Sequence, residues 1–201
     1  MEKGIKSKRK ILEVAFKLFA AYSYPDVSYS LLEKATDISR GSMVYYFKNK
    51  EGIFRDVVNT FVLDMGCIND IPQDRQRSIW EFYNAVCDKI AKSHEDAQSF
   101  DINNLNEASF NLERNALQFM PGFKEHRQKM QLEEFELWKK VMQNSINSGE
   151  LRPDIDVSVW ASAFQSIRMG QSYQGVYLPD IYNAESLRRL YESLYYTIKR
   201  V

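Results

Sequence analysis

The stretch SRGSMVYYFKNKE at residues 39–51 is the part of the sequence that decides the fold. It begins with the small residues Ser39, Gly41 and Ser42, and it continues into aromatic residues and then lysines. A short helix that begins with small residues can lie deep in the major groove of DNA, because no bulky side chain keeps its first turn away from the bases. We therefore expect residues 40–46 to form a recognition helix.

A second short helix is expected just before this stretch. Ser28 precedes residues 29–35, and a serine at this place can accept hydrogen bonds from the free N–H groups of a first helical turn. The turn that follows, at residues 36–38, contains Asp37, which tolerates a left-handed backbone better than most residues. Two short helices joined by a tight turn form a helix-turn-helix. Its small core is expected to consist of Leu32, Ala35, Ile38, Met43 and Phe47.

Charge is unevenly distributed, although the chain has 27 basic and 27 acidic residues and no net charge. Residues 1–50, which we call the head, contain ten basic and five acidic residues, so the head carries +5. Residues 51–201, the body, carry −5. A neutral chain argues against a nucleic-acid partner, but a basic segment joined to an acidic one is typical of a DNA-binding module. A solvated charged surface explains the charge pattern equally well.

The rest of the chain also has a helical pattern. Seven segments carry apolar residues at a spacing of three or four: residues 11–19, 53–65, 79–90, 105–119, 135–146, 159–167 and 187–198. The breaks between them carry turn residues, so that Ile71-Pro72 and Pro121-Gly122 are each expected to mark a helix boundary, and Gly149 to cap a helix end. The predicted fold class is all-α, with a three-helix N-terminal helix-turn-helix domain and a larger C-terminal helical domain.

Several classes of protein do not fit the sequence. The longest apolar run, Leu18 to Tyr22, is far too short to span a membrane, and no secretory signal follows the charged N-terminus. Two cysteines cannot form a disulfide scaffold, and His94 and His126 have no ligands at metal-site spacing. The sequence contains no glycine-rich phosphate loop and no nucleophile motif, so we do not expect an enzyme. We expect a cytoplasmic protein without metal or cofactor.

The segment from Lys10 to Phe54 resembles the N-terminal domain of the tetracycline-repressor (TetR) family of bacterial transcription regulators. The matching residues are Ile11-Leu12, Ala15, Leu18-Phe19, Tyr24, Ser28, Leu32, Ala35, Ile38 to Met43, Tyr45 to Glu51, and Phe54. Three positions depart from the family pattern: Glu33 replaces a small residue, Asp37 a turn glycine and Val44 a tyrosine. The valine cannot make the phosphate or base contact of a tyrosine.

The resemblance and the chemistry of the residues together imply a set of DNA contacts. Arg40 can read guanine or bind a phosphate, Tyr45 can touch base edges, and lysines on the flank can bind the DNA backbone. The competing interpretation of these residues is that Tyr45 and Tyr46 only pack within the protein and that the lysines only face solvent. The predicted DNA-binding residues are Ser28, Tyr29, Ser39, Arg40, Gly41, Ser42, Tyr45, Tyr46, Lys48 and Lys50.

The resemblance further implies that residues 1–50 form the DNA-binding domain and residues 51–201 an effector-binding and dimerisation domain. We expect a ligand-responsive repressor that binds double-stranded palindromic DNA as a homodimer and is released by a small, largely apolar effector. An activator, or an interaction protein with weakened DNA binding, remains an alternative.

Two further sets of residues are assigned to the body. Large side chains that could line an effector pocket, or pack as ordinary core, are Phe61, Met65, Trp80, Tyr83, Phe110, Phe119, Phe123, Trp138 and Tyr173. Apolar residues of the last two helical segments that could form a four-helix dimer interface, or pack within one chain, are Val159, Phe164, Ile167, Leu187, Leu190, Leu194 and Ile198.

Overall fold

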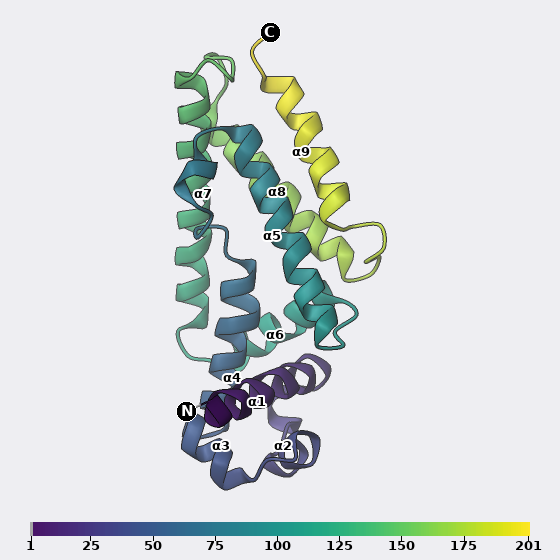
Figure 1. The fold of residues 1–201 in the computed structure, drawn as a ribbon. Helices are drawn as coiled ribbons and strands as arrows, with labels where there is room; N and C mark the ends of the chain where they lie inside the picture. The colour runs from purple at the N-terminus through teal and green to yellow at the C-terminus, as the bar shows by residue number, and fades with distance from the viewer. Residues whose placement is uncertain (1) are drawn as a thin grey trace. The chain divides into compact units, whose positions relative to one another are not determined.

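The computed structural model describes residues 2–201, with side chains from Ile5 onward (Figure 1). Within this range the regular secondary structure is helical apart from one isolated β-bridge between Leu151 and Lys199, as the all-α prediction requires. The elements are α1 (Glu2–Ala21), η1 (Tyr24–Asp26), α2 (Tyr29–Thr36), α3 (Arg40–Phe47), α4 (Lys50–Val58), η2 (Asn59–Asp64), η3 (Gln73–Gln76), α5 (Ile79–Ser99), α6 (Leu105–Phe119), α7 (Phe123–Asn147), α8 (Val157–Gly175) and α9 (Ala184–Ile198).

The chain divides into two compact units. The first unit runs up to Gly66 and also includes Ala97–Lys124, and the second consists of Cys67–Asp96 and Glu125–Val201. The first unit is larger than the predicted head because α4, η2 and α6 pack with the first three helices. Compact packing and functional division are different properties, so the functional boundary at residue 50 stays a prediction.

Aromatic side chains hold the first unit together. The ring of Phe16 in α1 stacks on Phe61 in η2, with centroids 4.2 Å apart and ring planes 4° apart. Phe19, one turn further along α1, packs edge-on against Phe54 of α4 at 5.0 Å. Because these rings are buried, they join α1 firmly to the helical run of α4 and η2.

Helix α6 belongs to the first unit through polar contacts with the end of α1. The Asn115 side chain accepts a 2.9 Å hydrogen bond from the backbone N–H of Tyr24, and Asn111 donates one of 3.1 Å to the carbonyl of Ala20. These side chains satisfy a carbonyl in the last turn of α1 and the N–H at the start of η1. Helix α6 therefore fixes the position where the chain leaves α1.

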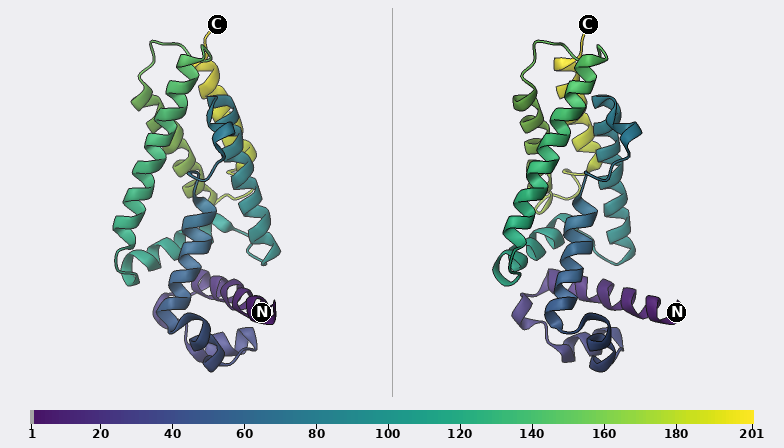
Figure 2. Two further views of the ribbon diagram at one scale, coloured as in Figure 1. Left: turned by 60° about the vertical axis from the view of Figure 1, so that its left-hand side comes forward. Right: turned by 90° about the vertical axis from the view of Figure 1, so that its left-hand side faces the viewer.

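The segment between α4 and α5 contains a π-helical turn. In η2 the N–H of Met65 donates to the carbonyl of Thr60, five residues earlier. Figure 2 shows α4 running on through η2 as one rod. This rod ends at Gly66, so the prediction that Ile71-Pro72 ends a helix is wrong. The apolar pattern ends before the proline, which instead precedes η3.

The second unit is built from α5, α7, α8 and α9 around a buried tryptophan. Trp138 of α7 is fully buried and packs against Phe82 of α5, Phe164 of α8 and Tyr191 of α9. The Tyr191 hydroxyl donates a 3.1 Å hydrogen bond to the carbonyl of Phe164, which satisfies a polar group inside this core. Each of the four helices thus contributes an aromatic residue to one cluster.

Helix ends follow the turn residues that the sequence indicated. Gly122 and Gly149 have positive φ angles of 79° and 81°, where glycine is not strained. The carboxylate of Asp156 accepts hydrogen bonds from the N–H groups of Ser158 and Val159 and caps α8. The predictions at Gly122 and Gly149 are confirmed, because each depends on local backbone chemistry. None of the described helices is both long and apolar enough to cross a membrane.

Candidate nucleic-acid interface

Helices α2 and α3 form the predicted helix-turn-helix. The turn between them contains Asp37 in the left-handed region at φ 57°, and its N–H donates to the carbonyl of Glu33 at 2.9 Å. Asp37 thus takes the place that glycine has in the family pattern. Behind the motif Leu32, Met43 and Phe47 are buried as predicted.

Two of the five predicted core residues of the motif differ from the expectation. Ala35 is exposed, so its assignment to the core is wrong, and Ile38 is only half-buried. The buried position is the neighbouring Thr36, whose hydroxyl donates a 2.7 Å hydrogen bond to the carbonyl of Leu32. That hydroxyl also accepts from the N–H of Ile38 at 3.1 Å, so a polar residue is satisfied inside the motif.

The first turn of each helix is capped by a serine. Ser28 accepts a 3.1 Å hydrogen bond from the N–H of Leu31, and Ser39 accepts a 3.4 Å hydrogen bond from the N–H of Ser42. Both capping serines are exposed. The start of a helix attracts anions, because its backbone N–H groups and its dipole both favour negative charge. The exposed start of α2 is therefore suited to a DNA phosphate.

One face of α3 is turned away from the core of the first unit. This face contains residues spaced by one or four positions, all of them exposed: Arg40, Gly41, Val44, Tyr45 and Lys48. Tyr45 is 82% exposed and Val44 40% exposed, which places two large side chains in solvent. Ser42 and Tyr46 are half-buried on the flanks of this face. An exposed face that combines an arginine, a glycine and a tyrosine can approach base edges closely.

Arg40 makes two contacts with α2. Its backbone N–H donates a 2.5 Å hydrogen bond to the Glu33 carboxylate, and its guanidinium lies over the ring of Tyr29 at 4.5 Å from the centroid. Sequence reasoning noted Glu33 only as a departure from the family pattern. The contact between Glu33 and Arg40 joins residues seven positions apart, and it depends on the geometry of the turn rather than on a local spacing rule.

Lys48 and Lys50 differ sharply in their surroundings. Lys48 ends α3 with a positive φ of 69° and an exposed side chain. Lys50 instead donates a 3.0 Å hydrogen bond from Nζ to the carbonyl of Tyr24, and burial lowers the pKa of its ammonium. The prediction that Lys48 and Lys50 both contact the DNA backbone stays a prediction, and the ammonium of Lys50 is engaged within its own unit whereas the side chain of Lys48 is exposed.

Gly52 is a second feature of the motif that sequence reasoning missed. Its N–H donates a 2.7 Å hydrogen bond to the side chain of Asn49, the N-cap of α4. A Cβ atom at this glycine would lie 1.9 Å from the carbonyl oxygen of Phe47. The close approach of α4 to the end of α3 thus requires a residue without a side chain. Nothing in the sequence around Glu51-Gly52 predicts the contact between Gly52 and the Phe47 carbonyl.

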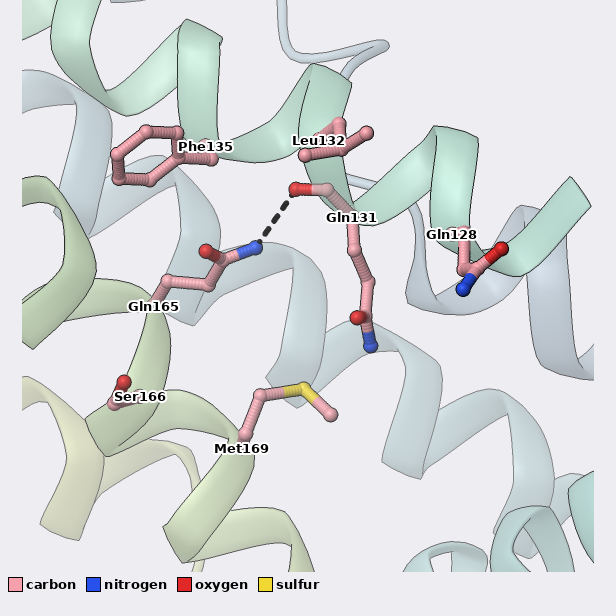
Figure 3. A pocket seen from close by; sticks show the side chains of 7 residues that line it. All are labelled: Gln128, Gln131, Leu132, Phe135, Gln165, Ser166 and Met169. Atoms are coloured by element: carbon pink, nitrogen blue, oxygen red, sulfur yellow. Dashed lines mark hydrogen bonds between the residues drawn. The ribbon is translucent and has the colours of Figure 1, made fainter. Parts of the chain in front are cut away.

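A groove in the second unit lies between α7 and α8 (Figure 3). It has a volume of about 770 Å³. Its lining residues are Gln128, Gln131, Leu132, Phe135, Gln165, Ser166 and Met169. The amide nitrogen of Gln165 donates a 3.0 Å hydrogen bond to the backbone carbonyl of Gln131, which links the two helices at the groove. The lining combines carboxamide and hydroxyl groups with apolar side chains and carries no charge.

None of the nine residues predicted for the effector site lines this groove. Four are buried, namely Phe61, Tyr83, Phe123 and Trp138; two are half-buried, Met65 and Phe119; and three are exposed, Trp80, Phe110 and Tyr173. Tyr83 and Trp138 pack in the aromatic cluster of the second unit. The nine residues are divided between the two compact units.

The seven residues predicted for the dimer interface fall into different burial classes. Val159 is 61% exposed and Leu190 is 40% exposed, while Ile167 and Leu194 are half-buried. Phe164, Leu187 and Ile198 are buried in the core of their own chain, so their assignment to an interface is wrong. A periodic apolar stripe does not distinguish the face that packs internally from the face that stays outside. Tyr196 on α9, which is 59% exposed, was not in the predicted set.

Titratable groups in the second unit are perturbed by burial. Burial lowers the pKa of His94 in α5, and it raises the pKa of the Cys87 thiol to about 12. In the part of the chain that the structure describes, no group of three or more histidine, cysteine or acidic residues is arranged to hold a metal ion.

Helix α7 and helix α8 are joined by an ion pair between Glu134 and Arg168, both nearly buried.

Comparison with known proteins agrees with this geometry. Residues 11–57 match the model described as bacterial regulatory proteins of the tetR family. The curated relative YhgD of Bacillus subtilis (strain 168), an uncharacterised helix-turn-helix-type transcriptional regulator, is 33% identical over 62 residues. These residues are 31% of this chain and 32% of YhgD, so the match spans about a third of the length of this relative.

Solved structures match over nearly the full length. NalD, the secondary repressor of the MexAB-OprM multidrug efflux pump in Pseudomonas aeruginosa, has a TM-score of 0.63 at 15% identity, over 100% of this chain and 99% of that one. The complex of SmeT with triclosan has a TM-score of 0.66 at 12% identity, over 97% and 92%. At these identities the likeness shows the fold. Residues 11–57 thus match the tetR family of bacterial regulatory proteins, and the chain as a whole shares the fold of these solved structures.

Proposed function

We propose that the protein is a transcriptional repressor in the bacterial cytoplasm, which binds a palindromic operator as a homodimer and leaves it when a small effector binds. The observation that carries this proposal is the exposed face of α3, on which Arg40, Gly41 and Tyr45 reach solvent while Met43 and Phe47 are buried behind it. A helix fixed in this way can enter a major groove without losing its packing.

Contacts with the DNA backbone and with bases are divided between the two helices. The exposed start of α2 at Ser28 and the charge of Lys48 suit phosphates, which give affinity and register. Sequence preference then rests on the α3 side chains that reach base edges. The residues proposed to contact DNA are Ser28, Tyr29, Ser39, Arg40, Gly41, Ser42, Tyr45, Tyr46 and Lys48.

A second copy of the chain is proposed to pack on the exposed apolar side chains of α8 and α9. Val159, Leu190 and Tyr196 are each at least 40% exposed. A two-fold dimer places two recognition helices on successive major grooves, and this explains a palindromic operator. Val159→Asp and Leu190→Asp should give monomers in size-exclusion chromatography with light scattering. Leu132→Asp, at a 66% exposed leucine of α7, is the matched control and should stay dimeric.

The groove between α7 and α8 is the proposed effector site. Its uncharged lining suits a neutral ligand with apolar surface and a few hydrogen-bonding groups. SmeT, which has the same fold at 12% identity, has been solved with triclosan bound, so triclosan is a suitable first probe. That any of the nine large residues first assigned to the effector site contacts a ligand stays a prediction.

The test of the DNA-binding function uses the full chain and fluorescent duplexes from the region upstream of its own gene. Fluorescence anisotropy should show binding that is about a thousandfold tighter, or more, than to a scrambled duplex at the same salt concentration. Arg40→Ala and Tyr45→Ala should abolish this difference. Equal affinity for both duplexes, with the chain folded, would contradict the proposal.

The test of the effector site measures the release of the operator. Triclosan and related neutral compounds should weaken operator affinity, and Met169→Trp, which narrows the groove, should remove the response while operator binding is retained. If compounds bind but operator affinity stays constant, the site does not control DNA binding, because regulation requires that the ligand bind the two states with different affinity.

An activator or an interaction protein is favoured by one observation, the exposed and apolar Val44 in the middle of the recognition face. Such a side chain offers no hydrogen bond to DNA, although it can contact a thymine methyl group. A reporter gene behind the upstream region separates the alternatives. Deleting the gene for this protein should raise expression for a repressor, lower it for an activator and leave it unchanged for an interaction protein.

A further inference from the structure

We propose that Tyr29 and Glu33 hold Arg40 in a fixed position for reading one guanine in each half of the operator. This inference rests on the proposed DNA-binding function and adds two positioning residues on α2 that set the sequence preference of α3. We call the three residues the arginine clamp. Glu33 was not among the residues predicted to act at the DNA.

The clamp is formed by one face of α2. Tyr29 and Glu33 are four residues apart, so their side chains leave the helix on the same side. The Tyr29 ring lies under the guanidinium of Arg40 at 4.5 Å, and the Glu33 carboxylate accepts a 2.5 Å hydrogen bond from the backbone N–H of Arg40. Arg40 is therefore held at two points, one on its backbone and one at the end of its side chain.

This arrangement leaves the hydrogen-bonding edge of Arg40 available. A guanidinium uses its flat face when it stacks on an aromatic ring, and its N–H donors lie in the plane of the group. Arg40 is exposed, and no carboxylate among the described side chains forms an ion pair with its guanidinium. The planar pair of donors matches the O6 and N7 acceptors of guanine in the major groove.

Glu33 also determines what can bind at the start of α3. Its carboxylate accepts a hydrogen bond from the first N–H of the helix, that of Arg40, and the Ser39 hydroxyl accepts one from the N–H of Ser42. A negative side chain at this helix start is favourable to the helix dipole and repels a DNA phosphate. Phosphate binding is left to the exposed start of α2, so that α3 presents Arg40 to bases.

The experiment starts by selecting binding sites for the full chain from randomised duplex DNA. Anisotropy is then measured on the selected site and on sites in which the clamped guanine is replaced by adenine or by 7-deazaguanine, which lacks the N7 acceptor. Wild type should lose about tenfold to a hundredfold in affinity for the adenine site. Arg40→Lys, which keeps the charge but loses the planar pair of donors, should bind the two sites almost equally.

Matched variants separate positioning from stability. Tyr29→Leu removes the ring and Glu33→Ala removes the acceptor, and each should reduce the guanine preference by about tenfold with little change at other positions of the site. Tyr29→Phe keeps the ring and Glu33→Gln keeps an acceptor oxygen, so both should retain the preference. Thermal unfolding of every variant shows whether the first unit stays folded.

Three results would overturn the inference. In the first, Tyr29→Leu and Glu33→Ala keep the full guanine preference. In the second, they weaken binding to all sites by the same factor, as expected if their role is purely structural. If either variant fails to fold, Arg40→Lys on the exposed surface decides, and an unchanged guanine preference in that variant overturns the clamp. A folded wild type that selects no DNA sequence would instead refute the proposed function itself.

Discussion

The Nζ atom of Lys50 donates a 3.0 Å hydrogen bond to the carbonyl oxygen of Tyr24 and lies 4.3 Å from the centre of the Tyr24 ring. This lysine closes the first unit between the end of α1 and the start of α4, whereas Lys48, two positions earlier, is exposed. Two neighbouring lysines of one motif therefore have different roles, one structural and one directed to solvent.

Salt dependence of operator binding should separate these roles. Lys48→Asn removes the charge and suits the positive φ at this position. It should reduce the slope of log affinity against log salt by about 0.9 for each bound protomer, because one phosphate contact is lost. Lys50→Met should leave the slope unchanged and lower the thermal stability. Titrations at several salt concentrations test both, and a smaller slope for Lys50→Met would restore its phosphate role.

A side chain at Gly52 should destabilise the first unit. In Gly52→Ala the new Cβ would lie 1.9 Å from the carbonyl oxygen of Phe47, and backbone must move to relieve this contact. We expect a loss of about 3 kcal/mol in the free energy of unfolding, at the upper end for overpacking. Gly66→Ala is the control, since nothing lies within 4 Å of its Cβ position. Equal denaturation midpoints for the two variants would disprove the close contact.

The ion pair between Glu134 and Arg168 should be costly to break from one side only. Their side chains are 7% and 11% exposed, and Glu134 Oε1 and Arg168 Nε have no hydrogen-bond partner. Glu134→Ala leaves a buried guanidinium unpaired and should cost about 3–5 kcal/mol. The double variant Glu134→Leu with Arg168→Met should be neutral or more stable, because no charge is then buried.

The control for this pair is the exposed ion pair of Lys92 with Asp96, at 2.8 Å. Lys92→Ala should leave the free energy of unfolding almost unchanged, because an i,i+4 pair on a helix surface is screened by solvent. Urea denaturation of the three variants measures each cost. If the double variant is as unstable as Glu134→Ala, the ion pair does more than neutralise two buried charges. It then adds to the free energy of unfolding of the second unit.

His94 should make stability depend on pH in the acidic range. Burial lowers the pKa of His94 below its ordinary value of 6.5. Between the two pKa values the unfolded chain binds more protons than the folded one, so stability is complete above 6.5 and falls as the pH drops through this range. His94→Gln should flatten this dependence in melting curves between about pH 5 and 7.5. His126→Gln, at an exposed histidine of α7, should leave it unchanged.

Local chemistry made much of the first unit predictable. The capping serines Ser28 and Ser39 and the left-handed Asp37 act on backbone groups within a few residues, so sequence alone located them. The contact of Lys50 with Tyr24 joins residues 26 positions apart, and no periodic pattern encodes it. Burial of Phe164, as opposed to exposure of Val159 on the same helix, depends on which face meets α7 and α9, and both faces are apolar.

The π-helical turn at η2 has a consequence for how this chain aligns with others. A wide turn holds one residue more than an α-helical turn, so residues after η2 are rotated by about 100° from the positions that an uninterrupted α-helix would give them. The segment in turn buries three consecutive side chains, Phe61, Val62 and Leu63, which a regular surface helix would direct to different faces. In evolutionary terms η2 has the form of a single-residue insertion that the helix absorbed without breaking. A relative with a regular helix here would align with a one-residue gap between residues 59 and 64, and its apolar pattern would resume in register only after Asp64.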